Sequence, residues 1–426
     1  MDIRHIETVL SDQKEELQHL MQQSFCRRAE EELIDLDSSM AQVVIGVRRS
    51  GKSTLCLNAL KRSGVKFAYI NFDDENLADI KAADLNPMLE VLYKIYGDFR
   101  HLFIDEIQNV DEWYLFVNRL LRRGMHVIIT GSNAKLLSGE LATHLTGRYM
   151  PIELYPFSFV EYCELNKVET TVRTTKATAF LRAAFDNYLH DGGFPELSKT
   201  RNHTTYIATL VESILERDIR QRFKMRYATA FFSMATHLLN IVPALVVTSS
   251  LSKLFGIKSD HTTENYIGYL KQAYLLVELR KFSPKSRLRV HDAKCYPIDI
   301  ALMNKRPNAF AGENMGWRLE CVVYIELLRR YGKEQKDIYY YLDQSNEVDF
   351  VVCQGNMPLE AYQVAFDIAN PKTRQRELAG LNTAAKKLHC SELWLITDHD
   401  REEVTLPCGA VAHIVPAYEW LLEGNR

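Results

Sequence analysis

The sequence predicts an α/β protein whose first region is a parallel sheet with helices on both faces. Short apolar stretches alternate with amphipathic stretches over the first 155 residues, and this alternation is typical of sheets in which each parallel strand is followed by a helix. The chain has 426 residues, of which 46% are hydrophobic and 25% are charged. At about 150 residues per domain, this length predicts two to four soluble globular domains.

The elements of the first region follow one another in a regular order. An amphipathic helical pattern covers residues 1–40. Buried strands are predicted at Gln42–Ile45, Lys66–Phe72, Leu102–Ile104, His126–Thr130 and Tyr149–Leu154. Helices are predicted between them from Lys52 to about Lys61, at Leu89–Tyr96 and at Glu112–Arg123. Residues 1–165 are therefore assigned to one domain that carries the parallel sheet.

Two polar segments divide the rest of the chain. The first is Asn166–Thr178, which contains five threonines, and the second is Lys305–Gly312. Residues 179–305 are mainly helical and end in a helix, a turn, a second helix and a strand pair. In residues 306–426 a helix and strands are predicted at Trp317–Arg330 and near Ile338–Leu342, Glu347–Val352, Leu359–Ala365 and Glu392–Thr397. The sequence therefore predicts three domains.

Composition and charge exclude several classes of protein. Lys and Arg total 52 against 55 Asp and Glu, so the net charge gives no argument for nucleic acid over the whole chain. The eight cysteines include no CxxC pair, which excludes the usual zinc-finger spacing. The first residues lack the apolar core of a signal peptide, and no run of about 18 apolar residues occurs. We expect a cytoplasmic protein with reduced thiols and no membrane partner.

A phosphate-binding loop is the sharpest signal in the chain. The pattern GxxxxGK[ST] is matched in full by Gly46, Val47, Arg48, Arg49, Ser50, Gly51, Lys52, Ser53 and Thr54. A predicted strand precedes this loop and a predicted helix follows it, so backbone N–H groups and the positive end of the helix would face phosphate oxygens. Lys52 would reach the β- and γ-phosphates, and the Ser53 hydroxyl would bind Mg²⁺. The sequence therefore predicts a nucleotide site.

A pair of acids follows the third predicted strand. Asp105, at the carboxyl end of that strand, would hold Mg²⁺ through its water shell. Glu106 would orient and deprotonate the attacking water as a general base. Many strands end in a solvated acid, and it is the combination with the phosphate loop that gives these two carboxylates a mechanism.

Two further side chains are candidates for contact with the γ-phosphate. The fourth strand ends in TGSN, next to the phosphate-loop strand in a sheet of this kind, so Asn133 or Ser132 would sense that phosphate; an Asn in a strand-to-helix turn is the alternative. Arg148 would neutralise charge on the transferred phosphoryl group as an arginine finger, or it is a solvated or ion-paired side chain. If Arg148 acts in trans, the active form is a homo-oligomer.

Eleven segments carry a family resemblance. In chain order they are GVRRSGKST, FAYINFDDE, LFIDEIQNVDEW, VIITGSNAKLLSGEL, LTGRY, LYPFSFVEY, GGFPE, ERD, KCYPIDIAL, EVDF and TRQREL. With them the chain, from about residue 20 to 400, resembles bacterial and archaeal AAA+-superfamily ATP-binding proteins joined to a C-terminal domain of unknown function. The resemblance implies an AAA+ fold, ATP with Mg²⁺, and the roles given above for Lys52, Ser53, Asp105 and Glu106.

A helix-turn-helix pattern lies in the middle domain. Val247–Ile257 reads as a short helix ended by glycine, and His261–Ala273 reads as a second helix after a short turn. Leu275–Phe282 and Arg287–His291 would then form a two-stranded wing. We favour a winged helix over a generic helical subdomain, and members of the resembled family look similar in this region.

Two basic clusters would allow the middle domain to bind DNA. The wing cluster comprises Arg280, Lys281, Lys285, Arg287 and Arg289. The second cluster, which has Asp218 as its counter-charge, comprises Arg217, Arg220, Arg222, Lys224 and Arg226. The second helix of the pattern is weaker for phosphate neutralisation, since Glu264 opposes Thr262, Thr263, Asn265 and Lys271. Solvated faces, or contacts with the nucleotide domain, are the alternatives.

The last domain resembles the restriction-endonuclease-like α/β core. That core places a helical Glu, a strand Asp and a Glu-x-Lys tripeptide around Mg²⁺. Here Glu320 lies on a predicted helix, Asp349 on a strand, and Glu360 and Gln363 on the next strand. The tripeptide that starts at Gln363 ends in Ala365 and lacks the ammonium group. We therefore expect a degenerate site without nuclease activity, or an interaction domain whose acids are solvated or ion-paired.

Two hypotheses about function follow from these motifs. In the first, the protein is an ATPase that couples ATP turnover to a nucleic-acid-related task through the winged helix and the last domain. In the second, it is a nucleotide-dependent signalling or assembly switch that binds a protein partner and does not contact DNA. The basic wing favours the first hypothesis, and the weakly basic second helix opposes it.

Overall fold

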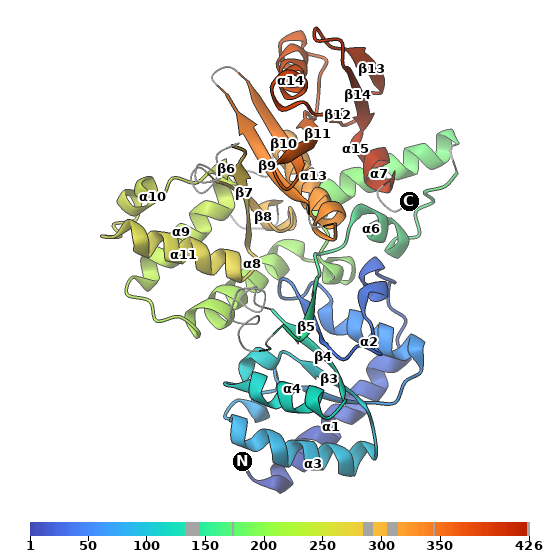
Figure 1. Ribbon diagram of the computed structural model, residues 1–426, viewed down its shortest axis with the longest axis vertical. Helices are drawn as coiled ribbons and strands as arrows, with labels where there is room; N and C mark the ends of the chain where they lie inside the picture. Colours follow the sequence, from blue (N-terminus) through green and yellow to red (C-terminus); the bar gives the residue numbers. More distant parts are fainter. Residues whose placement is uncertain are drawn as a thin grey trace. The chain divides into compact units, whose positions relative to one another are not determined.

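The computed structural model describes residues 1–132, 145, 147–172, 174–283, 293–304, 314–334, 336–343 and 346–423. The chain forms two compact units (Figure 1). The first comprises Met1–Tyr155 and Gln272–Tyr274, and the second comprises Pro156–Lys271 and Leu275–Arg426. Each unit has its own sheet and its own apolar core.

The first unit contains a parallel sheet, which Figure 1 colours from blue to green. Its five strands are β1 (Ala41–Ile45), β2 (Phe67–Asn71), β3 (His101–Asp105), β4 (His126–Gly131) and β5 (Tyr149–Glu153). They follow the order β2-β3-β4-β1-β5, and each neighbouring pair is parallel. All residues of β1 are buried, as expected for a strand covered on both faces. The predicted parallel sheet is confirmed.

Helices of the first unit pack against this sheet. They include α1 (Ile3–Gln22), α2 (Lys52–Ser63), α3 (Leu85–Tyr96) and α4 (Trp113–Arg122). Leu17 of α1 and Leu55 of α2 share one apolar cluster with Val44, Phe103 and Ile128 of the sheet. This cluster fixes the position of α2, and thereby of the loop that precedes it, on the sheet.

Helix α1 ends at Gln22, so the helical prediction for residues 1–40 is wrong over its second half. Arg28 has an extended backbone, and a short 3-10 helix, Ala29–Leu33, follows it. Arg28 and Glu31 are only 4% and 6% exposed, although an amphipathic helix was predicted over this segment. Buried charges need partners at fixed positions. These partners lie on the phosphate loop and on α2, and the chain leaves the helix to reach them.

The second unit contains a mixed sheet in the order β13-β14-β12-β11-β10-β9-β7-β8-β6. Its nine strands are β6 (Ala244–Leu245), β7 (Leu276–Lys281), β8 (Ala293–Pro297), β9 (Asp337–Leu342), β10 (Glu347–Gln354), β11 (Met357–Val364), β12 (Glu392–Thr397), β13 (Glu402–Thr405) and β14 (Val411–Pro416). Strand β10 is antiparallel to β9 and β11, whereas β7 and β9 are parallel. The strands predicted for the last region correspond to β9, β10, β11 and β12.

The second unit also carries most of the helices. They include α6 (Phe159–Leu165), α7 (Thr175–Asp191), α8 (His203–Ser213), α9 (Ala228–Ile241), α10 (Thr248–Leu254), α11 (Asp260–Gln272), α12 (Ala301–Asn304), α13 (Met315–Gly332), α14 (Pro371–Thr383) and α15 (Ala417–Glu423). The predicted helix pair corresponds to α10 and α11, and β8 pairs antiparallel with both β6 and β7. The predicted second wing strand, Arg287–His291, lies outside the described residues.

Six of the eight cysteines are buried. All eight cysteines lie in the described ranges, and none of them forms a disulfide bond. Burial raises the pKa of the Cys163 and Cys295 thiols to about 12, so these thiols are unreactive at neutral pH. Within the described ranges, no helix has the length and apolar character that spanning a membrane requires.

Candidate active site

The phosphate loop connects β1 to α2, and two of its glycines are required by geometry. A Cβ atom at Gly46 would lie 2.1 Å from the backbone oxygen of Leu154, which leaves no room for a side chain. Gly51 is the N-cap of α2 in the left-handed conformation, with φ at 98°, which glycine adopts without steric cost. The loop thus brings the positive end of α2 to the carboxyl edge of the sheet.

Lys52 is the first residue of α2, and its side chain is only 4% exposed. Its Nζ atom donates hydrogen bonds to the backbone oxygens of Gly46 (3.2 Å) and Val47 (3.1 Å). The same atom lies 3.7 Å from Oε1 of Glu106. The ammonium group is therefore held inside the loop, where a phosphate group would be a stronger partner.

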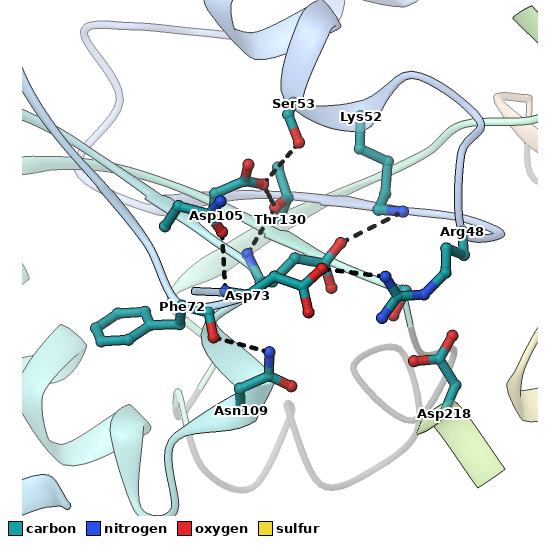
Figure 2. Close-up of polar contacts among 12 residues, drawn as sticks. Arg48, Lys52, Ser53, Phe72, Asp73, Asp105, Asn109, Thr130 and Asp218 are labelled. Atoms are coloured by element: carbon teal, nitrogen blue, oxygen red, sulfur yellow. Dashed lines mark hydrogen bonds and ion pairs between the residues drawn. The ribbon is translucent and has the colours of Figure 1, made fainter. Parts of the chain in front are cut away.

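Three side chains that carry oxygen atoms meet beside Lys52 (Figure 2). Ser53 Oγ donates to Asp105 Oδ1 at 2.8 Å, and the Thr130 hydroxyl donates to the same oxygen. Burial, and next the Glu106 carboxylate, raise the pKa of Asp105 to about 6, although the hydrogen bonds from Thr130 and Ser53 act in the opposite direction. A cation placed here would favour the ionised form of Asp105.

Glu106 directs its carboxylate at Lys52 from an unusual backbone conformation. Its φ is 51°, in the left-handed region that residues other than glycine rarely adopt. Its backbone N–H donates to Thr130 Oγ1 at 3.0 Å, and the side-chain amide of Gln108 donates to its Oε2. Conformations of this kind gather at functional sites. No role was predicted for Thr130 or Gln108 from the sequence.

The other residues of the phosphate loop differ from one another in burial and in their contacts. Val47 and Ser50 are fully buried. Arg48 forms an ion pair of 3.1 Å with Asp73, which follows β2 (Figure 2). Arg49 has a positive φ of 67°, and Thr54 lies in the first turn of α2. The loop is therefore tied to the β2 side of the sheet as well as to its own helix.

Ser53 and Asp105 suit a magnesium ion that arrives with a nucleotide. Both supply hard oxygen atoms, and their 2.8 Å separation brings these atoms to one point. In the described part of the chain, no group of three or more His, Cys, Asp or Glu side chains could hold a metal ion by itself.

The structure does not place two of the predicted residues at this site. Asn133 lies outside the described residues. The backbone oxygen of Arg148 accepts from Ala41 at the amino end of β1, whereas the phosphate loop follows Ile45 at the carboxyl end. The intervening strand spans about 13 Å, so Arg148 does not reach the phosphate loop of its own chain. A contribution in trans stays a proposal.

Arg28 is a supporting residue that sequence reasoning missed. Its guanidinium group donates to the backbone oxygens of Ser50 (3.2 Å) and Tyr155 (2.9 Å). Glu31 accepts from the Arg28 backbone N–H at 3.0 Å and pairs with Arg62 of α2 at 3.0 Å. An amphipathic helix was predicted over this segment, and no local pattern in it signals these contacts.

The predicted wing cluster is neutralised in part. Arg280 and Lys271 both pair with Glu278, although Arg280 still exposes 55% of its side chain. Lys281 is the last residue of β7. Three members of the cluster lie outside the described residues, namely Lys285, Arg287 and Arg289.

The second basic cluster is also paired locally. Arg220 lies 2.9 Å from Glu216, and Arg222 lies 3.9 Å from Asp218. On α11, Thr263 is fully buried and accepts a hydrogen bond from another buried hydroxyl at 2.9 Å. Thr263 is therefore unable to contact a ligand on the surface.

The predicted nuclease-like residues come together in part. Asp349 of β10 and Gln363 of β11 are joined, since the Asp349 N–H donates to Gln363 Oε1 at 2.7 Å. Burial, and next the carboxylate of Glu320 on α13, raise the pKa of Asp349. Glu360 does not join them and accepts hydrogen bonds from two tyrosine hydroxyls, each at 2.6 Å. Residues 360 and 363 face opposite sides because side chains alternate along a strand.

An ammonium group that the sequence did not predict completes this C-terminal cluster. Lys294 of β8 pairs with Glu347 and lies 3.9 Å from Glu320. Burial lowers the pKa of Lys294, but the carboxylates of Glu320, Asp349 and Glu347 together raise it above its ordinary value. The acids thus have a cationic partner although Ala365 stands where the lysine was expected. No spacing along the chain connects Lys294 with these acids.

Three family models match successive parts of the chain. Residues 38–163 match the model described as AAA domain. Residues 182–311 and 315–420 match two models described as domains of unknown function, DUF8612 and DUF4143. The AAA match covers the phosphate loop and the strand that ends in Asp105.

Two relatives match over most of the chain. One is described as "Uncharacterized protein MJ1544" from Methanocaldococcus jannaschii and is 32% identical over 403 residues, which cover 91% of this chain and 90% of the relative. The other, described as "Uncharacterized protein" from Haemophilus influenzae, is 30% identical over 403 residues, which cover 91% of this chain and 95% of the relative.

Solved structures give weaker likenesses. The replication initiator DnaA bound to AMPPCP and single-stranded DNA is 15% identical with a TM-score of 0.25, over 55% of this chain and 82% of that chain. The RuvB Holliday junction branch migration motor of Thermotoga maritima is 16% identical with a TM-score of 0.29, over 63% of this chain and 88% of that chain. On the strength of the two relatives and the three family models, the chain belongs to a family of P-loop proteins in which two domains of unknown function follow an AAA domain.

Proposed function

We propose that the protein binds ATP with Mg²⁺ and hydrolyses it. One observation carries this proposal: Lys52, Ser53, Asp105 and Glu106 converge at the carboxyl edge of the parallel sheet. Ser53 lies 2.8 Å from Asp105, and Lys52 lies 3.7 Å from Glu106. A phosphate-binding loop, a pair of metal ligands and a carboxylate base are the parts that phosphoryl transfer to water requires.

Each side chain has its own task in the proposed reaction. The loop amides and Lys52 hold the phosphates and stabilise the charge that develops on the leaving group. Ser53 and Asp105 would hold Mg²⁺, which neutralises charge on the β- and γ-phosphate oxygens. When phosphate binds, Lys52 contacts the phosphate in place of the Glu106 carboxylate. Glu106 then takes a proton from the attacking water.

Chelation of divalent metal is expected to stop the reaction. Without a cation, Ser53 and Asp105 bind each other and the phosphate charge stays unneutralised. Phosphate release from ATP by the full chain should fall to background in EDTA and return with excess Mg²⁺. A rate that persists unchanged in EDTA would contradict the assignment of the metal ligands.

We further propose that ATP turnover serves a nucleic-acid-related task through a winged helix. The element order α9, β6, α10, α11, β7, β8, with β8 between β6 and β7 in the sheet, supports this proposal. In such motifs the second helix of the pair enters the major groove and the hairpin contacts the phosphate backbone. Arg280, whose side chain is 55% exposed, lies in β7, which corresponds to the first predicted strand of the wing.

DNA binding through the wing is expected to depend steeply on salt. Five basic wing residues that each replace one counterion give a slope of about −4.5, so affinity should fall about 500-fold between about 50 and 200 mM salt. Fluorescence anisotropy of a labelled duplex measures this. The double substitution Arg280→Ala, Lys281→Ala should reduce the slope by about 2, whereas Lys386→Ala, at an exposed position elsewhere, should leave it unchanged. Absent or salt-independent binding would exclude this task.

A protein partner is the second candidate, and one observation favours it. Three apolar side chains in and beside α10 are exposed: Leu245 by 48%, Val247 by 47% and Leu254 by 62%. These side chains lie within ten residues of the chain, and exposed apolar surface is typical of protein contacts rather than phosphate contacts. Should DNA binding fail, the nucleotide site is proposed to act as an assembly switch, with Arg148 completing a neighbouring site in a homo-oligomer.

The C-terminal cluster is proposed to be catalytically silent. Asp349 Oδ2 accepts the backbone N–H of Val364 at 2.9 Å, and Lys294 neutralises Glu320 and Glu347. These contacts satisfy carboxylates that a nuclease would use for metal ions. DNA from the binding experiment should therefore remain intact in Mg²⁺ or Mn²⁺, and cleavage that Asp349→Ala abolishes would overturn this proposal.

A further inference from the structure

Gln108 contacts the carboxylate that we propose as the general base. It lies in a short 3-10 helix, Ile107–Asn109, directly after Glu106. Its Nε2 atom donates to Glu106 Oε2 and lies 3.5 Å from Oγ of the fully buried Ser132. The amide is therefore placed between the catalytic carboxylate and the end of the neighbouring strand β4.

The two oxygens of the Glu106 carboxylate have different partners. Oε1 lies 3.7 Å from Nζ of Lys52, and Oε2 receives the hydrogen bond from Gln108. A phosphate group would draw Lys52 away from Oε1, and this oxygen is the one that we expect to accept a proton from water. The neutral amide of Gln108 is a weaker partner for phosphate than the ammonium group of Lys52, so its bond to Oε2 is expected to persist.

The backbone that carries Gln108 is firmly attached to the sheet. The next residue, Asn109, donates its side-chain amide to the backbone oxygen of Phe72 at 3.0 Å (Figure 2). Ile107 is fully buried. The backbone N–H of Asn109 donates to the backbone oxygen of Glu106 at 3.2 Å. These contacts hold the Gln108 amide at a fixed place relative to Glu106.

The other end of the amide has no comparable use in the fold. Gln108 Oε1 is buried, and within the described residues it has no hydrogen-bond partner. A buried acceptor without a partner is unfavourable, so the bond to Glu106, rather than stability, explains a glutamine at this position. A charged side chain would not serve equally, because a carboxylate would repel Glu106 and an ammonium would compete with Lys52.

We propose that Gln108 is a positioning residue that fixes the rotation of the Glu106 carboxylate and keeps Oε1 directed at the γ-phosphate. The inference rests on the proposed ATPase function. Gln108 acts through Glu106 and does not itself contact the substrate.

The test is steady-state ATP hydrolysis by the full chain carrying Gln108→Met, which keeps the volume of the side chain and removes the donor. We expect kcat to fall about 10²-fold, as for a catalytic group that loses its orientation. The KM for ATP and the affinity for a fluorescent ATP analogue should change less than about threefold. The matched control is Gln42→Met, at a glutamine that is also buried (2% exposed) but lies in β1; its kcat should be unchanged.

A double substitution separates positioning from general disruption. In a Glu106→Gln background, Gln108→Met should have no further effect on kcat, because the group that it orients is already lost. An additive loss, or a wild-type kcat in the single variant, would overturn the inference. If Glu106→Gln itself leaves hydrolysis unchanged, it is the proposed function that fails.

Discussion

Replacing Glu106 with glutamine is expected to slow ATP hydrolysis by about 10²–10⁴-fold, the usual contribution of a general base. The amide has the shape of the carboxylate but takes no proton from water. The Ser53–Asp105 contact of 2.8 Å does not involve Glu106, so nucleotide and Mg²⁺ should still bind. Single-turnover phosphate release and equilibrium binding of a fluorescent ATP analogue measure the two effects separately.

Lys52→Ala should give a different result, in which binding itself is weakened. Truncation of one partner in a buried charge pair costs about 2 kcal/mol or more, which corresponds to about 30-fold in affinity. The matched control is Lys61→Ala, at the far end of the same helix, where the lysine is exposed and donates to the backbone oxygen of Gln23. If hydrolysis is unchanged in both Lys52→Ala and Glu106→Gln, the site assignment is wrong.

The phosphate site was predictable because its chemistry is local in the sequence. The loop from Gly46 to Thr54 is one contiguous segment, and both acids follow a short apolar strand. Parallel strands end at the same edge of a sheet, so the two motifs were expected to meet. The fourth strand was also expected to lie beside the phosphate-loop strand, and the pairing of β1 with β4 confirms this.

The identity of the contacting side chain on β4 was not predictable. Ser132 and Asn133 were proposed to sense the γ-phosphate, which stays a prediction, whereas no role was given to Thr130, which binds Asp105 and the Glu106 backbone. The register pairs Ile104 with Ile129 and so places the next residues, Asp105 and Thr130, side by side. A register depends on how two strands separated along the chain pack together, and local composition does not encode it.

The contacts of two buried charged side chains were also not predicted from the sequence. The sequence assigned no role to Arg28 or Lys294, yet one supports the phosphate loop and the other neutralises the C-terminal acids. A charge is buried when distant segments provide its partners, and these partners are visible only in three dimensions. The parallel pairing of β7 with β9 is another contact between segments far apart in the chain, and local composition does not encode it.

The glycines of the GGFPE segment were noted only as a family marker, and the structure gives them a physical reason. Gly193 donates its N–H to Asp299 Oδ2 at 2.8 Å and accepts from the Phe157 N–H at 2.6 Å. A Cβ atom at Gly193 would lie 2.2 Å from the backbone oxygen of Phe157. That oxygen also accepts a hydrogen bond of 2.9 Å from the Tyr188 hydroxyl, so it is held in place from two sides.

Gly193→Ala is therefore expected to destabilise the second unit by about 3 kcal/mol, at the upper end of the usual cost of overpacking. The backbone must shift to admit the methyl group, and a shift breaks the bonds to Asp299 and Phe157. Gly268→Ala is the matched control, because a Cβ in the middle of α11 would meet no atom within 4 Å in the described chain. It should stabilise the protein by about 0.5–1 kcal/mol through helix propensity. Urea unfolding of the full chain measures both changes; equal stability of the two variants would show that the close approach at Gly193 does not constrain the fold.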